Sequence, residues 1–202
     1  MAASAMNKAP FLAALLPLAL LVAGCDRAAP VEEAPLAGAK LGGPFALTDQ
    51  DGRAVTDRSF AGRYRLVYFG YTYCPDVCPT SLQVLMGGYH QFAKASPDAA
   101  KKVVPILVTV DPERDTPAVM KQYVAAFGPE LVGLTGTPAA IADAARRYGV
   151  SYGKRQDEGA SGYLMDHVSA AILFGPAGEP IALVPQDGTR DQVAAELAKW
   201  VR

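Results

Sequence analysis

The chain contains no run of like charge. Its 19 Lys and Arg residues are balanced by 20 Asp and Glu residues, which leaves a net charge of −1. Nucleic-acid-binding proteins usually carry a basic patch, so this composition argues against nucleic acid as a partner. Of the 202 residues, 50% are hydrophobic and 19% are charged, which is typical of one globular domain with a sizeable core. We therefore expect metals, small groups or proteins as partners.

The N-terminal apolar stretch is too short for a comfortable transmembrane helix. Lys8 is the only charged residue before Asp26, and the uncharged segment between Ala9 and Gly24 is rich in Leu and Ala. This pattern is typical of the hydrophobic core of a signal peptide. We interpret residues 1–24 as a signal peptide that directs the domain out of the cytoplasm, with an uncleaved signal anchor as the alternative.

Cysteine is scarce, and its odd count of three calls for an explanation in an exported protein. Residues 21–25 read LVAGC and resemble the bacterial lipobox, in which the cysteine becomes lipidated and N-terminal after cleavage. Acyl chains on Cys25 would anchor the protein in a membrane, and Asp26 resembles an inner-membrane retention signal. Residues 25–42 then form a lipidated N-terminus and a flexible tether. We expect the domain to face the periplasm of a bacterial cell envelope.

Residues 43–202 alternate strand and helix patterns without internal repeats. Asp51-Gly52 lies between two short strand patterns and predicts a β-hairpin. Further strands are predicted at residues 64–69, 103–110, 131–134, 168–174 and 181–184, and helices at 78–95, 116–127, 139–148 and 191–201. A βαβ unit followed by ββα, with a cysteine pair after the first core strand, is typical of thioredoxin. We predict an α/β, thioredoxin-like fold with a central mixed sheet and an N-terminal β-hairpin extension.

The remaining cysteines, Cys74 and Cys78, lie four residues apart at a predicted helix N-terminus. Positions i and i+4 share one helix face about 5–6 Å apart, so both sulfurs can face one soft metal ion. The helix N-terminus favours thiolate, the form that binds metal. A disulfide is the alternative, but so small a loop gains little stability from closure and would favour a labile, redox-active bond.

A third metal ligand can be sought by elimination, because the chain has only two histidines. His90 lies in the same predicted helix as Cys78 and about 18 Å further along its axis, so the two cannot share a metal. Met86 is excluded by the same reasoning at about 12 Å. His167 precedes the predicted strand at 168–174, and in a thioredoxin fold that position faces the cysteine loop. His167 is therefore the candidate third ligand.

Two thiolates and one imidazole suit Cu(I), Cu(II) or Zn(II), and ligand type alone does not choose among these ions. Asp166 adjoins His167 and could orient its ring from outside the ligand set. Against this, neighbours in an extended chain point to opposite sides.

Two further polar segments lie near the predicted site. Asp111, Arg114 and Asp115 follow a buried strand, and we favour a role in tying down their loop over a role in docking a partner or in supporting the metal ligands from outside the ligand set. Residues 154–166 are polar and contain glycine, which predicts a mobile segment that orders when metal binds.

Three motifs together resemble the Sco/SenC family of copper chaperones. They are CPDVCP at residues 74–79, VDPERDTP at residues 110–117, and Asp166-His167 before an apolar strand that ends in Gly175-Pro176. The resemblance covers about residues 43–202. It implies that Cys74, Cys78 and His167 bind a copper ion, as Cu(I) or Cu(II). Val168 departs from the family pattern, which usually has Ser or Thr there, and this removes a hydroxyl near the site without changing a ligand.

The resemblance implies a metallochaperone, and it leaves thiol–disulfide reductase activity open. Its partner would be the copper-centre subunit of cytochrome c oxidase, whose binuclear copper centre the family helps to build. Other copper carriers and thioredoxin-like reductants are further expected partners. The alternative is a thiol–disulfide oxidoreductase that reduces the oxidase copper-site cysteines by cycling Cys74 and Cys78. A peroxiredoxin-like peroxidase is disfavoured, because no Thr-x-x-Cys motif precedes Cys74.

Overall fold

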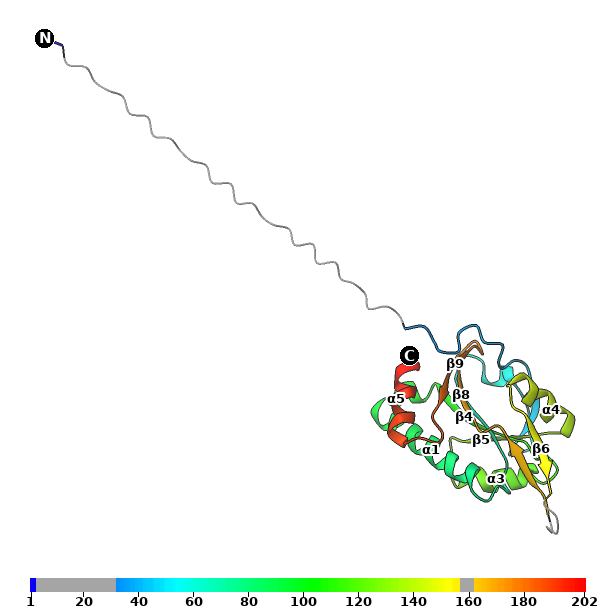
Figure 1. Ribbon diagram of the computed structural model, residues 1–202. Coiled ribbons are helices and arrows are strands. Elements are labelled where there is room, and N and C mark those ends of the chain that lie inside the picture. Colours follow the sequence, from blue (N-terminus) through cyan, green and yellow to red (C-terminus); the bar gives the residue numbers. More distant parts are fainter. Residues whose placement is uncertain (3–31, 157–161) are drawn as a thin grey trace. The chain divides into compact units, whose positions relative to one another are not determined.

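The computed structural model describes residues 1–2, 32–156 and 162–202 (Figure 1). The predicted signal peptide, Cys25 with its lipobox, and the first part of the predicted tether lie outside the described residues. The domain extends from Glu33 to Arg202. Of the helices in the described ranges, none combines the length and the apolar character that crossing a membrane requires.

The centre of the sheet is formed by its most apolar strands. β3 (Tyr64–Gly70) and β4 (Val103–Thr109) pair in parallel and are buried along their full length. Burial on both faces explains why each strand is a continuous apolar run without polar alternation. β8 (Ala171–Phe174) pairs antiparallel with β3, and β9 (Pro180–Val184) pairs antiparallel with β8.

The other half of the sheet carries the N-terminal hairpin. β5 (Val132–Thr135) runs parallel to β4, and β1 (Ala46–Asp49) pairs antiparallel with β5. β2 (Ala54–Thr56) completes the hairpin with β1 at the sheet edge. The strand order is β2-β1-β5-β4-β3-β8-β9, which confirms the predicted mixed sheet with a hairpin extension.

Helices cover both faces of this sheet (Figure 1). α1 (Val77–Ala95) packs against α5 (Arg190–Trp200), and α3 (Pro117–Ala125) lies on the same face. α4 (Pro138–Arg147) covers the opposite face, where the following Tyr148 packs on the aromatic rings of β3 and β8. Two short helices were not predicted, η1 (Asp57–Phe60) and α2 (Pro97–Ala100).

Residues 34–42 differ from the prediction, because they pack on the domain and do not continue a flexible tether. The backbone N–H of Leu36 donates to the carbonyl of Ile181 at 3.0 Å, and that of Gly42 donates to the carbonyl of Arg147 at 2.9 Å. Three apolar side chains of this segment contact the core: Ala34, Leu36 and Leu41. Burial of these spaced apolar residues places the domain boundary near residue 33 and not at the predicted residue 43.

A second, two-stranded sheet was not predicted. β6 (Tyr152–Arg155) and β7 (Leu164–His167) pair antiparallel, with Tyr152 opposite His167. The sequence placed a mobile segment at residues 154–166 and began a strand at residue 168. In the structure β6 and β7 occupy the two ends of that segment. Its residues 157–161 lie outside the described part. β6 is mostly exposed, so it lacks the apolar pattern that identifies a buried strand.

Candidate metal centre

Cys74 and Cys78 lie where the chain leaves β3 and enters α1. Cys74 is in the connecting loop, and Cys78 is the second residue of the helix. Both are free thiols. The backbone N–H of Cys78 donates to the Cys74 sulfur at 3.4 Å, so the positive end of the helix is directed at that sulfur.

The two thiols differ sharply in exposure and acidity. Cys74 is partly exposed, whereas Cys78 is 0% exposed. Burial raises the pKa of Cys78 to about 12, and the neighbouring Cys74 sulfur adds to this effect. Burial also acts to raise the pKa of Cys74, but hydrogen bonds from the backbone N–H groups of Cys78 and Asp76 outweigh it and hold that pKa below the ordinary thiol value. Cys74 is therefore the more readily ionised sulfur.

His167 reaches the buried thiol from the end of β7. Its Nε2 atom lies 3.3 Å from Cys78 Sγ, and its Nδ1 atom donates to the carbonyl oxygen of Val168 at 3.1 Å. A carbonyl can only accept, so the proton of the neutral ring is on Nδ1 and the lone pair of Nε2 is directed at Cys78. Burial lowers the pKa of His167, which favours the neutral, metal-binding form.

The donor atoms fit a metal ion after a small rearrangement. A tetrahedral ion with bonds near 2.0–2.3 Å holds its sulfur and nitrogen ligands roughly 3.5 Å apart, close to the 3.3 Å between Cys78 Sγ and His167 Nε2. As they stand, no three His, Cys, Asp or Glu side chains of the described residues are grouped to hold a metal. Cys74 must turn toward the other two donors, and it shares with His167 a pocket of about 360 Å³ in which to do so.

Asp166, whose role in orienting the His167 ring the sequence left open, makes no hydrogen bond to that ring. Its carboxylate is exposed and lies 3.3 Å from Nε of Arg155. The partner of the His167 ring is instead the Val168 carbonyl, which sequence reasoning could not identify because any residue supplies a carbonyl. The charge of Asp166 acts on His167 only by opposing the burial that lowers its pKa.

His90 and Met86, which the sequence excluded as metal ligands, lie away from the cysteines, as predicted. His90 is exposed on α1 and lies 3.2 Å from Glu130. Met86 is 2% exposed and belongs to the core.

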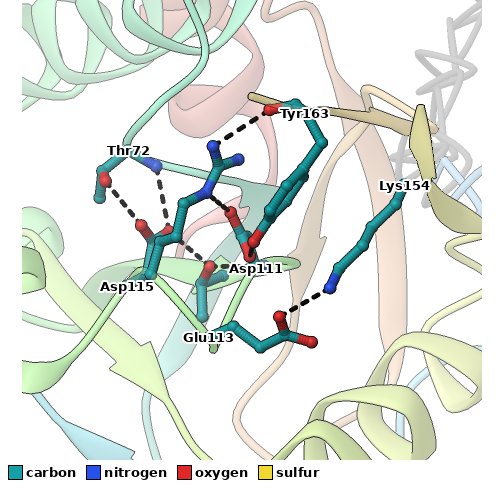
Figure 2. A network of polar contacts seen from close by, with 8 residues as sticks. Thr72, Asp111, Glu113, Asp115, Lys154 and Tyr163 are labelled. Carbon is teal, nitrogen blue, oxygen red and sulfur yellow. Dashed lines mark hydrogen bonds and ion pairs between the residues drawn. The ribbon is translucent and has the colours of Figure 1, made fainter. Parts of the chain in front are cut away.

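Arg114 connects the cysteine loop to the segment that carries His167. Its guanidinium pairs with Asp111 and donates from Nη1 to the Tyr163 carbonyl at 3.0 Å. It also stacks between two aromatic rings, 3.8 Å from the centre of Tyr163 and 4.7 Å from that of Tyr73. The Tyr163 hydroxyl donates to Asp111 at 2.8 Å (Figure 2). These contacts confirm that Arg114 and Asp111 tie down their loop. They also show that the β6–β7 hairpin, which carries His167, is held against that loop.

Asp115 fixes the loop residues that precede Cys74. Its buried carboxylate accepts the backbone N–H of Thr72 at 3.0 Å and the Thr72 hydroxyl at 2.6 Å (Figure 2). It also accepts the hydroxyl of Thr109 at 2.6 Å. Burial raises the pKa of Asp115, although these hydrogen bonds oppose the shift. The prediction foresaw a loop-tying role for Asp115 but not its partners, because they are distant in sequence.

Comparison with known proteins gives one family over the whole domain. The SCO1/SenC family model matches residues 33–202. The Arabidopsis thaliana protein SCO1 homolog 1, mitochondrial, is 38% identical over 173 residues, which cover 85% of this chain and 51% of that protein. The chain thus spans about half the length of this curated relative.

Solved structures show the same fold. Bradyrhizobium japonicum ScoI, solved with copper bound, is 43% identical, with a TM-score of 0.71 over 79% of this chain and 99% of that one. BsSco is described as a member of the Sco family of cytochrome c oxidase assembly proteins. It is 23% identical, with a TM-score of 0.62 over 85% of this chain and 100% of that one. The matching family model and the 38% identity together show that this chain belongs to the SCO1/SenC family.

Proposed function

We propose that this protein is a copper metallochaperone that binds one copper ion through Cys74, Cys78 and His167. The observation that carries the proposal is the 3.3 Å approach of His167 Nε2 to Cys78 Sγ, with the Cys74 sulfur at the same helix N-terminus. Two sulfurs and an imidazole are a soft donor set that suits copper. Zinc would accept the same set, and the copper found in Bradyrhizobium japonicum ScoI favours copper here.

The exposure of the ligands suits delivery of copper better than permanent storage. Cys74 and His167 are both partly exposed and line the pocket, while Cys78 is buried and is not part of the lining. A partner's ligands can therefore replace Cys74 and His167 one at a time. The partner we propose is the copper-centre subunit of cytochrome c oxidase, which agrees with the description of BsSco as a member of an oxidase assembly family. Other copper carriers would load the site.

The difference between the two thiols favours a second candidate function, thiol–disulfide exchange. Cys74 has the lowered pKa and the exposure of an attacking thiolate, and Cys78 lies behind it. Cys74 would attack a disulfide of the oxidase copper site, and Cys78 would then form the Cys74–Cys78 disulfide and release the partner as a dithiol. The partner gains two electrons and this chain loses two, so a thioredoxin-like reductant must restore it.

We further propose that the protein is a lipoprotein of the bacterial cell envelope. The lipobox at residues 21–25 supports lipidation at Cys25 after removal of residues 1–24. Because the domain begins near residue 33, the tether would be only about eight residues long. Such a tether spans less than about 30 Å, so the domain would work close to the periplasmic surface of the inner membrane.

Copper stoichiometry of the reduced protein tests the chaperone proposal. We expect one Cu(I) per chain in the wild type and a loss of affinity of about 100-fold or more in His167→Ala. His90→Ala is the matched control, because His90 is exposed on α1 and pairs with Glu130. A His167→Ala variant that binds copper as tightly as wild type would remove His167 from the site.

A second readout on the same variants separates the two functions. A reductase depends on Cys74 and Cys78 alone, so His167→Ala should still reduce a disulfide peptide at a rate near that of wild type. If the wild type binds no copper while retaining this reduction, the chaperone proposal is wrong and the oxidoreductase function replaces it.

A further inference from the structure

A second pocket lies at the end of the sheet opposite to the cysteines. It has a volume of about 280 Å³ and is formed by the start of β3, by η1 and by the turn between β8 and β9. Its lining includes Arg58, Asp57, Phe60, Arg65 and Gly178. Because Arg65 is near the first residue of β3 and the cysteine loop follows the last, about 20 Å of strand separates the two sites.

Arg65 brings a buried positive charge to this pocket. The residue is only 5% exposed, and its Nη1 atom has no hydrogen-bond partner among the described residues. A guanidinium stays charged at any pH a folded protein meets, and a buried charge without a partner is costly. The stacking of the guanidinium over the Phe174 ring, at 5.6 Å from its centre, offsets only part of this cost.

No acidic side chain of the described residues lies within salt-bridge distance of Arg65. Asp57 lines the same pocket, but no ion pair joins it to Arg65. The Tyr148 hydroxyl lies near the guanidinium and is also buried without a hydrogen-bond partner. The Tyr148 oxygen could accept from the guanidinium but makes no hydrogen bond to Nη1, so this Arg65 donor stays unused among the described residues.

The backbone is arranged to leave room for a ligand beside the guanidinium. Gly178 has a φ of 95°, and a Cβ at this position would lie 2.9 Å from Arg65 Nη2. A side chain at residue 178 would therefore press on the guanidinium, whereas glycine leaves it accessible from the pocket. Arg58 is exposed on η1 and adds a second positive charge at the rim.

We propose that this pocket binds a small, singly charged oxoanion of the phosphate type, held by Arg65 with support from Arg58. The planar guanidinium matches the spacing of two oxygens on one phosphorus atom. The carboxylate of Asp57 in the pocket wall disfavours ligands with more negative charge. Dihydrogen phosphate and the phosphodiester of a phospholipid headgroup share this chemistry, and the second source would bring the domain to the membrane surface.

Calorimetric titration of the full-length, reduced protein with phosphate at pH 6 tests the proposal, with sodium chloride of equal ionic strength as the blank. We expect saturable binding in the wild type and a dissociation constant weaker by about tenfold or more in Arg65→Met. Arg63→Met is the matched control, because Arg63 is an exposed arginine two residues away that does not line the pocket; it should bind as wild type does. Glycerophosphoethanolamine, titrated in parallel, distinguishes the sources: tighter binding of this diester points to a lipid headgroup, and tighter binding of phosphate points to the free ion.

Ala177→Asp keeps the proposal testable if Arg65→Met does not fold. Ala177 is an exposed turn residue that lines the pocket, so aspartate there adds a repelling carboxylate without disturbing the core. This variant should also lose binding. The proposal is overturned if neither compound binds the wild type, or if binding persists unchanged in Ala177→Asp and in a folded Arg65→Met.

Discussion

His167 Nε2 lies 3.3 Å from Cys78 Sγ, although 89 residues separate the two along the chain. Cys78 is fixed at the start of a long helix, while His167 ends a two-stranded hairpin that is separate from the main sheet. The site therefore depends on how that hairpin is held against the cysteine loop. Contacts that fix the loop or the hairpin should influence the site without providing a ligand.

The two cysteines should differ in their reaction with iodoacetamide. The lowered pKa of Cys74 and its exposure predict alkylation that is already rapid at pH 7–8 and levels off below the pH at which an ordinary thiol would ionise. Burial raises the pKa of Cys78 to about 12, so its alkylation should be slower by about 100-fold or more and still rising at pH 9. Mass spectrometry of the two sites after timed labelling measures both rates. Equal rates in the folded protein would contradict the described asymmetry.

Asp115→Asn should make the loop before Cys74 less firmly held and should destabilise the domain. The carboxylate accepts three hydrogen bonds, two from Thr72 and one from Thr109. An amide has one acceptor oxygen, and its NH₂ group would face a donor. We expect the free energy of unfolding to fall by about 1–3 kcal/mol, measured by urea denaturation. Asp98→Asn, at an exposed position where the carboxylate pairs with Lys101, is the control and should unfold as wild type does.

The raised pKa of Asp115 gives this prediction a pH dependence. Because burial raises the pKa of Asp115 in the folded state, the folded state holds this proton more tightly than the unfolded state does. The contribution of Asp115 to stability therefore falls as the pH rises from 3.8 through the folded-state pKa. Asp115→Asn has no such proton, so its cost relative to wild type should be larger below this window than above it. A difference that stays constant from pH 3.5 to 7 would mean that Asp115 does not titrate differently on folding.

Gly88→Ala tests the close packing that holds α1 in place. A Cβ at Gly88 would lie 2.4 Å from Cβ of Val193 on α5, too close for two helices that cannot move apart without opening the core. Alanine favours helix by about 1 kcal/mol over glycine, so a clash is needed to reverse that preference. We expect a net loss of about 1–3 kcal/mol, seen as a lower melting temperature. Gly153→Ala, where no atom lies within 4 Å of the added Cβ, is the control.

The sequence was most informative where burial imposes a pattern. The apolar runs of β3 and β4 and the spacing of Cys74 and Cys78 identified the sheet centre and the helix N-terminus before any coordinates. β6 was missed because its side chains are mostly exposed and carry no apolar alternation. Residues 34–42 were missed because their Ala, Pro and Gly content is typical of a linker, whereas their packing depends on the distant Ile181 and Arg147.

The support of the site was harder to predict than its ligands. Soft metals bind few residue types, so three candidate ligands could be named from residue type, spacing and the expected fold. The Val168 carbonyl that orients His167 has no sequence signal. Tyr163 lies within a segment read as mobile, yet it contacts both Asp111 and Arg114. Such contacts are specified by tertiary packing and not by local pattern.

Arg114→Lys should weaken copper binding although Arg114 is not a ligand. The guanidinium joins Asp111, the Tyr163 carbonyl and the Tyr73 ring at once. Lysine keeps the charge but has neither the planar fork nor the flat surface that these contacts use. The hairpin carrying His167 would then be less firmly held against Cys78, and we expect Cu(I) affinity to fall by about 10-fold to 100-fold, as for other residues that orient metal ligands.

The matched control is Lys154→Met, in the same group of contacts (Figure 2). Lys154 pairs with Glu113 at 2.6 Å on the exposed side of Tyr163, and exposed pairs contribute little. Competition against a Cu(I) chelator should therefore give near wild-type affinity for Lys154→Met and weaker affinity for Arg114→Lys. Alkylation of Cys74 separates a positioning role from general unfolding: its rate should change little in Arg114→Lys, while Cys78 remains protected. If Arg114→Lys exposes Cys78 as fully as urea does, Arg114 serves the stability of the whole domain and not the placement of His167.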